Sequence, residues 1–292
     1  MTSHDVVDAI RRLVHERQVG HAGTLDPMAT GVLIVAVGAA TRLTEFMMGH
    51  PKTYQFTVRL GQQTDTDDAT GRVIEQQPVP PLSSEDISRV LATFRGTIEQ
   101  TPPQYAAIRH RGKRLYEWAR EGIFVETSPR QVTIYTLTLI QWSPPDLELE
   151  VTCSAGTYVR ALARDIARAL STVGHVTALR RTASGPFRIE DAVPLSELLQ
   201  AKDWQRYLRP PDAGLVDMPI RELTPEHAQA MLHGRPLHGL PAAPPNQTWA
   251  RAYLYGRFVG MIQWDAQQHT WRPRKVFPTL IERALKSPMS HT

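Results

Sequence analysis

Two side chains that could do acid–base or nucleophilic chemistry stand in a glycine-rich stretch near the start of the chain, Gly20–Gly31. His21 and Asp26 are its only side chains that titrate near physiological pH. Its glycines and its proline favour a tightly folded loop over a helix or strand. The apolar run at 32–37 that follows predicts a fully buried strand. A carboxylate on a rigid loop beside such a strand suits catalysis, although Asp-Pro pairs also occur in plain turns.

Three further stretches carry polar or aromatic groups in a suggestive pattern. Lys52-Thr53-Tyr54 opens a strand expected at 52–60, where a tyrosine is ordinarily a core residue. Gly156-Thr157-Tyr158-Val159-Arg160 follows a strand expected at 147–153 and opens a helix. Side chains in a first helical turn can reach the open end of a sheet, although an ordinary surface ion pair is the alternative for its arginine. The third stretch, at 175–182, ends a further strand with two consecutive arginines.

The acidic loop at 61–71 does not complete a calcium site. Asp65 and Asp67 match the first two ligand positions, but Ala69, Thr70 and Gln76 stand where a ligand, a glycine and a glutamate are needed. Zinc-protease, P-loop, dinucleotide-binding and serine-hydrolase motifs are also absent from the sequence. The eleven histidines are scattered. We therefore expect no metal and no cofactor.

The single cysteine, Cys153, excludes a disulfide framework within the chain and is expected to be a buried thiol. The composition is that of a soluble globular protein, with 41% hydrophobic and 21% charged residues, and its 292 residues allow two domains. A net charge of +4 suits a polyanionic partner, although a harmless excess of solvated arginine is the alternative. We see no secretion signal and no membrane span, and we expect a cytoplasmic protein.

The periodicity of the chain predicts an α+β fold with a largely antiparallel sheet, because helices and strands mix without regular alternation. A helix capped by Ser3 is expected first, and a proline-rich connection near 209–214 is a plausible linker. Short strands expected at 250–254, 258–264 and 271–277 indicate a small β-rich domain. The remaining expected helices lie at 39–48, 84–95, 115–120 and 156–170, and the remaining strands at 72–75, 131–142, 147–153 and 176–182.

The whole string from Gly20 to Leu33 resembles the signature of the TruB family of tRNA pseudouridine synthases. The stretch Gly156–Arg160 resembles the second active-site motif of that family, and His175–Arg181 resembles a third. The segments 257–261 and 271–277 look like a PUA-type RNA-binding module. The resemblance implies a pseudouridine synthase catalytic domain at 1–208 and a C-terminal β-rich PUA-like domain at 215–292.

The resemblance also implies the reaction and its central residues. Uridine 55 in the T-arm loop of tRNA would be isomerised to pseudouridine by base flipping, without a cofactor. Asp26 would attack the nucleoside, at C6 of the base or C1′ of the sugar. Arg160 would pair with Asp26, and a bidentate guanidinium would keep a carboxylate ionised in a site emptied of water. Tyr54 would stack on the base and is a candidate for taking its C5 proton.

The resemblance implies further contacts with the substrate. Tyr158 and Leu179 would shape the uridine pocket, and His21 would fill the gap left by the flipped nucleotide. Basic side chains are expected to hold RNA phosphates: Arg109, Arg111, Lys113, Arg180 and Arg181. We expect the T-arm stem-loop of tRNA as the partner, no membrane, no obligate protein partner, and a monomer.

Other readings of the sequence stay open. A non-catalytic module that binds or folds tRNA is the main alternative. A glycosidic-bond hydrolase would need an activated water, for which no general base is evident. A guide-RNA-dependent relative would fit the same motifs, although the lack of long basic tails favours a stand-alone enzyme. Family members usually carry a further strand before the Thr-Ser that stands here at positions 2 and 3, and we expect a form with that strand to be more stable.

Overall fold

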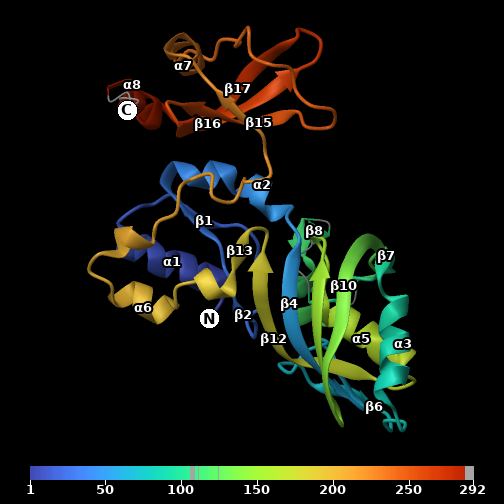
Figure 1. Ribbon diagram of the computed structural model, residues 1–292. Coiled ribbons are helices and arrows are strands. Elements are labelled where there is room, and N and C mark those ends of the chain that lie inside the picture. The colour runs from blue at the N-terminus through green and yellow to red at the C-terminus, as the bar shows by residue number, and fades with distance from the viewer. Residues whose placement is uncertain (106–108, 111, 124, 287–292) are drawn as a thin grey trace. The chain divides into compact units, whose positions relative to one another are not determined.

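The computed structural model describes residues 1–105, 109–110, 112–123 and 125–286 (Figure 1). The chain divides into two compact units. Unit 1 comprises Met1–Val6, Gly23–Ile34 and Met48–Ala192, and unit 2 comprises Val7–Ala22, Val35–Met47 and Val193–Thr292. Each unit is made of three separate segments of the chain, whereas the ranges expected from the sequence, 1–208 and 215–292, are continuous.

A seven-stranded sheet forms the frame of unit 1 within the described residues. Its strands, in spatial order, are β13 (Phe187–Arg188), β12 (Gly174–Ser184), β4 (Lys52–Leu60), β11 (Asp146–Cys153), β10 (Arg130–Ser143) and β7 (Gly96–Gln100), and β2 (Thr30–Gly31) pairs with β12. The β2–β12 pairing is parallel and the other pairings are antiparallel. This confirms the expected α+β fold with a largely antiparallel sheet.

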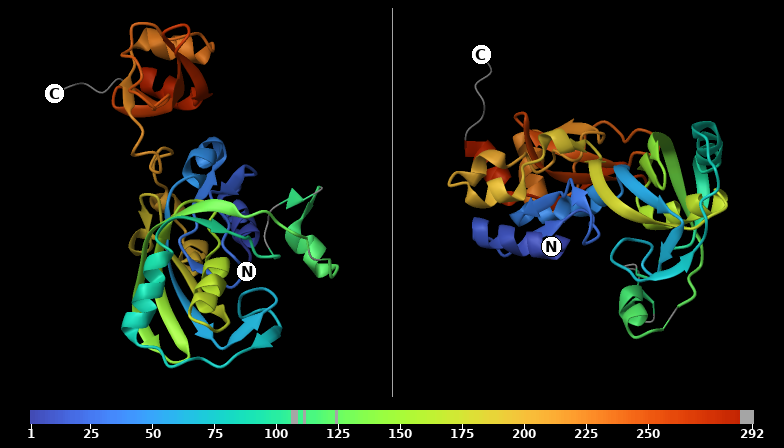
Figure 2. Two further views of the ribbon diagram at one scale, coloured as in Figure 1. Left: turned by 90° about the vertical axis from the view of Figure 1, so that its right-hand side faces the viewer. Right: turned by 90° about the horizontal axis from the view of Figure 1, so that it is seen from below.

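The core of unit 1 lies on one face of this sheet, under α3 (Ser84–Thr93) and α5 (Val159–Ala169) (Figure 2). Strands β4 and β11 alternate along their length, so that Phe56, Leu149 and Val151 point into the core and are at most 2% exposed. Each such side chain contributes roughly 1.5–3 kcal/mol on burial. Cys153 is buried in the same row, as expected.

Shorter elements complete unit 1. Ser83 caps α3, in a capping box with Asp86. The remaining elements of the unit are β5 (Gln62–Thr64), β6 (Val73–Gln76), β8 (Arg109–His110), β9 (Lys113–Arg114), α4 (Leu115–Arg120) and the 3-10 helix η2 (Ile189–Asp191). Helix α1 (Ser3–Val14) begins in unit 1 and ends in unit 2.

Unit 2 contains a four-stranded sheet of β14 (Ile220–Glu222), β15 (Trp249–Leu254), β16 (Arg257–Asp265) and β17 (Thr270–Val276). Its core includes Trp271, Ile262 and Ile281, and the three strands expected in this region are confirmed. The other elements are β1 (Val19–His21), β3 (Val35–Val37), η1 (Gly38–Leu43), α2 (Thr44–Met48), α6 (Leu195–Gln200), η3 (Trp204–Tyr207), α7 (Pro225–Leu232) and α8 (Pro278–Lys286). None of the helices in the described part of the chain is long and apolar enough to span a membrane.

Two expectations about the N-terminal region were wrong. The run at 32–37 is not one buried strand: only Val35–Val37 is a strand, paired with β1, while the amide of Val32 donates to the carbonyl oxygen of Arg181. Helix α1 is capped by Thr2 rather than Ser3, through reciprocal hydrogen bonds between Thr2 and Asp5. The Ser3 hydroxyl instead makes hydrogen bonds with the backbone of Leu25, in the loop that carries Asp26.

Candidate active site

The loop that carries Asp26 is tied down immediately beside that residue. The Ser3 hydroxyl accepts a hydrogen bond from the Leu25 amide at 2.9 Å and donates to the Leu25 carbonyl oxygen at 3.2 Å. The Asp26 carbonyl oxygen accepts from the Ala29 amide at 2.9 Å, which closes a tight turn. Ser3 is 5% exposed, so this clamp is shielded from water. The backbone on both sides of Asp26 is therefore held in place.

Arg160 approaches from the start of helix α5. Tyr158, two residues earlier, is the N-cap of the helix but makes no side-chain cap. Gln100 of β7 instead holds the backbone of the cap residue itself: its carboxamide accepts from the Tyr158 amide at 2.8 Å and donates to the Tyr158 carbonyl oxygen at 3.1 Å. Gln100 is 2% exposed. It therefore fixes the first turn of α5, on which Arg160 stands.

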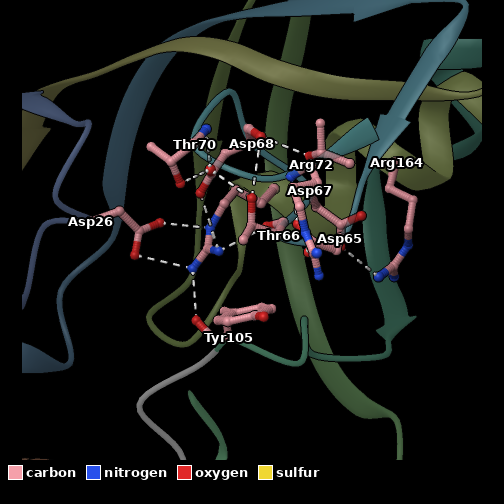
Figure 3. Close-up of polar contacts among 11 residues, drawn as sticks. Asp26, Asp65, Thr66, Asp67, Asp68, Thr70, Arg72, Tyr105 and Arg164 are labelled. Carbon is pink, nitrogen blue, oxygen red and sulfur yellow. Dashed lines mark hydrogen bonds and ion pairs between the residues drawn. The ribbon is translucent and has the colours of Figure 1, made fainter. Parts of the chain in front are cut away.

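Asp26 and Arg160 form the bidentate pair that the resemblance implied (Figure 3). Arg160 Nε lies 2.9 Å from one carboxylate oxygen of Asp26, and Nη2 lies 3.2 Å from the other. The Arg160 side chain is 6% exposed and that of Asp26 is 34% exposed. The carboxylate is thus held in place by a buried cation and stays partly open to a substrate.

The acidic loop supplies a second carboxylate to the same arginine. Asp68 Oδ2 lies 3.3 Å from Arg160 Nη1, and the Thr66 carbonyl oxygen accepts from Nη1 at 3.0 Å. The Tyr105 carbonyl oxygen accepts from Nη2 at 3.1 Å (Figure 3). Hydrogen bonds from Thr66 and Thr70 orient Asp68 in turn. The guanidinium is therefore fixed from several sides.

Sequence reasoning missed this role of the acidic loop. We tested the loop only as a calcium site, in which Asp65 and Asp67 were the first ligands. In the structure the loop contributes its carboxylates to ion pairs: Asp67 lies 3.0 Å from Arg164, one helical turn beyond Arg160. Burial raises the pKa of Asp67, and the charge of Arg164 opposes this rise. The spacing of two arginines by four residues opposite a run of aspartates was the signal available.

Tyr54 and Leu179 lie together on the core face of the sheet. Tyr54 of β4 pairs with Val151 and Arg181 on the neighbouring strands, and Leu179 of β12 pairs with Phe56. Leu179 is part of the buried core. Tyr54 is partly buried and packs against that core. Burial raises the pKa of the Tyr54 phenol, and the positive charge of Arg181 opposes this rise. The phenol is therefore neutral at physiological pH.

Two of the expected pocket residues, Tyr158 and His21, lie in different units of the structure. Tyr158 is half-buried beside Arg160, and burial raises the pKa of its phenol. His21 lies in strand β1 of unit 2, paired with Val35. The substrate contacts expected of both residues stay predictions.

The residues expected to contact RNA differ in their exposure to solvent. Arg181 is 1% exposed and donates to backbone carbonyls, so the structure does not present its guanidinium to a phosphate. Arg180, its neighbour, is exposed. Lys113 is exposed, 2.9 Å from Glu121 and over the ring of Trp118. Arg109 lies in β8, and Arg111 falls outside the described residues. For these last four residues the RNA contact stays a prediction.

The chemistry available at this site is that of one held carboxylate and a nearby phenol. Asp26 is oriented by Arg160 and partly exposed, as a nucleophile must be to reach a substrate. In the described part of the chain, no group of three or more histidine, cysteine, aspartate or glutamate side chains could hold a metal ion.

The family models match this chain across the site. The model for the TruB family pseudouridylate synthase N-terminal domain matches residues 11–159, and the model for the tRNA pseudouridylate synthase B C-terminal domain matches residues 160–216. The chain belongs to the TruB family. The first match covers Asp26, Tyr54 and Asp68, and the second begins at Arg160.

Relatives of similar length carry the same name. A tRNA pseudouridine synthase B of Chromohalobacter salexigens is 43% identical over 264 residues, 90% of this chain and 86% of that protein. One from Heliobacterium modesticaldum is 39% identical over 289 residues, 97% of this chain and 94% of that protein. The enzyme is therefore a tRNA pseudouridine synthase, an isomerase that forms pseudouridine in tRNA.

Solved structures support the fold. A Cbf5–Nop10–Gar1 complex superimposes on 96% of this chain and 83% of the matched chain, with a TM-score of 0.74 at 23% identity. An H/ACA RNP bound to a substrate RNA containing 2′-deoxyuridine covers 95% of this chain and 81% of the matched chain, with a TM-score of 0.72 at 23% identity. At this identity the likeness concerns the fold alone.

Proposed function

We propose that the enzyme isomerises uridine 55 of the tRNA T-arm loop, with Asp26 as the nucleophile and without a cofactor. The observation that carries this proposal is the bidentate contact of Arg160 with Asp26, on a loop whose backbone is clamped at Leu25. The arrangement holds one carboxylate oriented beside a buried cation, with 34% of its side chain exposed.

The proposed reaction is a rearrangement within one nucleoside. The C1′–N1 bond breaks, the uracil turns while it stays bound, and a C5–C1′ bond forms. The proton on C5 leaves, N1 gains a proton, and nothing is oxidised or reduced. Asp26 attacks C6 of the base or C1′ of the sugar and is released at the end, so the reaction requires no redox or metal chemistry.

The surrounding residues are proposed to act on the base and on Asp26. Arg160 pairs with Asp26 and orients it. Tyr54 stacks on the flipped base and is the candidate acceptor of its C5 proton once the base has turned, with the phenol passing its own proton to solvent as it does so. Tyr158 and Leu179 shape the pocket, and His21 occupies the place of the flipped nucleotide.

We further propose that unit 2 contributes an RNA-binding surface of PUA type, within a C-terminal domain of about residues 215–292. Its four-stranded sheet with two helices supports a small β-rich module, and it carries the exposed cations Arg257 and Arg274. The tRNA T-arm is the proposed partner. We propose a monomer that needs no protein partner.

Mapping of the modified position tests this proposal. A tRNA transcript is incubated with the enzyme, derivatised with a carbodiimide that marks pseudouridine, and read by primer extension. We expect one stop, at position 55, and no stop in a transcript with cytidine at that position. Stops at other uridines would reject the proposed site, and binding without any stop would favour the alternative of a non-catalytic tRNA-binding module.

A further inference from the structure

We propose that Arg181 is a positioning residue for the catalytic loop, and that it ties the two ends of that loop together around Asp26. This inference rests on the proposed role of Asp26. It assigns to a buried arginine a function in the reaction that differs from the RNA contact expected from its sequence context.

The Arg181 guanidinium reaches both ends of the loop. Its Nε donates to the Val32 carbonyl oxygen at 2.7 Å, at the end of the loop. Its Nη2 donates to the Gly23 carbonyl oxygen at 3.1 Å, and its Nη1 reaches that of Thr24 at 3.4 Å, at the start. One side chain therefore brackets the segment 23–32, with Asp26 inside it.

The backbone of Arg181 holds the same segment. Strand β12 pairs in parallel with β2, placing Arg181 opposite Gly31, and the Val32 amide donates to the Arg181 carbonyl oxygen at 2.9 Å. The approach is so close that a Cβ on Gly31 would lie 2.1 Å from the Arg181 carbonyl oxygen. The side chain and the backbone of one residue thus fix the end of the loop in register with the sheet.

Burying the guanidinium of Arg181 costs free energy unless its charge is paired or its N–H groups are hydrogen-bonded. The residue is 1% exposed, and the hydrogen bonds of its guanidinium to the loop go to backbone carbonyl oxygens rather than to a carboxylate. A buried cation is ordinarily paired with an anion. Here its partners are three carbonyl oxygens of the loop and the Tyr54 hydroxyl, which only a planar fork of several N–H groups can reach from one point. A lysine has one ammonium nitrogen and cannot bracket the loop in this way.

The neighbouring residue provides a matched comparison. Arg180 stands next to Arg181 on β12, and because successive side chains of a strand point to opposite faces, it is exposed while Arg181 is buried. A phosphate contact would affect tRNA binding and its salt dependence. A positioning role would affect the rate at saturating tRNA, because a displacement of a catalytic group by about 1 Å can cost on the order of 100-fold.

The experiment compares Arg181→Lys, Arg181→Met and Arg180→Met with the wild-type full chain. Thermal melts establish that each variant is folded at the assay temperature. Single-turnover rates at saturating tRNA and Kd values at two salt concentrations are then measured. We expect both Arg181 variants to lose roughly 10-fold or more in rate with Kd within about twofold of wild type. We expect the loss in Arg180→Met to appear in Kd, with a salt slope smaller by about one.

Two results would overturn the inference: a folded Arg181→Lys variant with the wild-type rate, or a loss confined to Kd. Should the Arg181 variants melt below the assay temperature, Ser3→Ala replaces them, because it removes only the neighbouring clamp at Leu25. A wild-type rate in Ser3→Ala would show that loop placement does not limit the reaction. Asp26→Asn is assayed in parallel; if it turns over, the proposed nucleophile fails independently of Arg181.

Discussion

Arg160 binds two carboxylates at once, and this arrangement determines what each of them does. Asp26 is the more exposed of the two, whereas the Asp68 side chain is 7% exposed and is held by Thr66 and Thr70. A buried carboxylate beside the guanidinium orients it without competing for the substrate. Asp68 is therefore expected to act through Arg160.

We predict that Asp68→Asn lowers the rate at saturating tRNA by roughly 10- to 100-fold, since loss of a charged hydrogen bond to a buried group costs about 1.5–3 kcal/mol. The measurement is the single-turnover rate, with Kd for tRNA determined in parallel and expected to stay the same. Asp65→Asn is the matched control, because Asp65 lies in the same loop but pairs with the exposed Arg72. Equal rates in the two variants would contradict the role of Asp68.

Lys52 provides a prediction about stability and pH. Burial lowers the pKa of Lys52 to about 8, and its ammonium donates to the carbonyl oxygens of Met48 and His50. Between this pKa and the ordinary value of 10.5, the unfolded state binds the proton and the folded state does not. The free energy of unfolding therefore rises with pH across that interval.

The test compares wild type with Lys52→Met by urea denaturation from about pH 7.5 to about pH 10.5. The difference in unfolding free energy, wild type minus variant, is expected to increase by roughly 2–3 kcal/mol over that range. Taking the difference between the two proteins cancels the titration of other groups. A difference that stays constant or falls would show that Lys52 is not a buried cation of lowered pKa.

At the scale of elements, the loop at 23–32 that carries Asp26 depends on a glycine at its end, Gly31. Gly31 has a φ of +104° and lies opposite Arg181 in the parallel pairing. Strain and the close approach of the Arg181 backbone both oppose a Cβ there.

We predict that Gly31→Ala lowers the free energy of unfolding by about 2 kcal/mol or more, measured by urea denaturation. Gly49→Ala is the matched control, because a Cβ at Gly49 meets nothing within 4 Å and its φ is not in the left-handed region. Equal stability of the two variants would mean that the β2–β12 pairing tolerates a side chain at position 31.

Local patterns predicted many of these elements well. The strand expected at 52–60 is β4 to the residue, because a half-buried strand alternates along its whole length. The helix expected at 84–95 likewise lies at Ser84–Thr93, from its local pattern of apolar residues. The pairing of Asp26 with Arg160 could not follow from periodicity, because 134 residues separate them; it came from the family resemblance.

Non-local contacts account for what the sequence did not predict. The two arginines at 180 and 181 read alike, and only the pairing of β12 with β2 and β4 decides which one is buried. The apolar run at 32–37 likewise gave no sign that Val32 contacts β12 while Val35 pairs with β1. The clamps made by Ser3 and Gln100 join residues 22 and 58 positions apart, beyond the range of any local pattern.

At the scale of the whole molecule, the net charge of +4 concerns tRNA binding rather than the fold. We predict that the double variant Arg257→Gln/Arg274→Gln weakens tRNA binding several-fold. Its salt slope should fall by roughly 0.7–0.9 for each phosphate that the variant no longer neutralises. Filter binding at several salt concentrations measures both quantities. Unchanged Kd and slope would contradict an RNA-binding role for the strands of unit 2.

The most direct test of the central claim is tritium release from tRNA labelled at C5 of uridine, with wild type beside Asp26→Asn. Forming the C5–C1′ bond expels the C5 hydrogen, so each turnover releases one label. We predict release by the wild type only, with tRNA Kd unchanged in the variant. Release by Asp26→Asn at the wild-type rate would contradict the claim that the carboxylate held by Arg160 is the nucleophile.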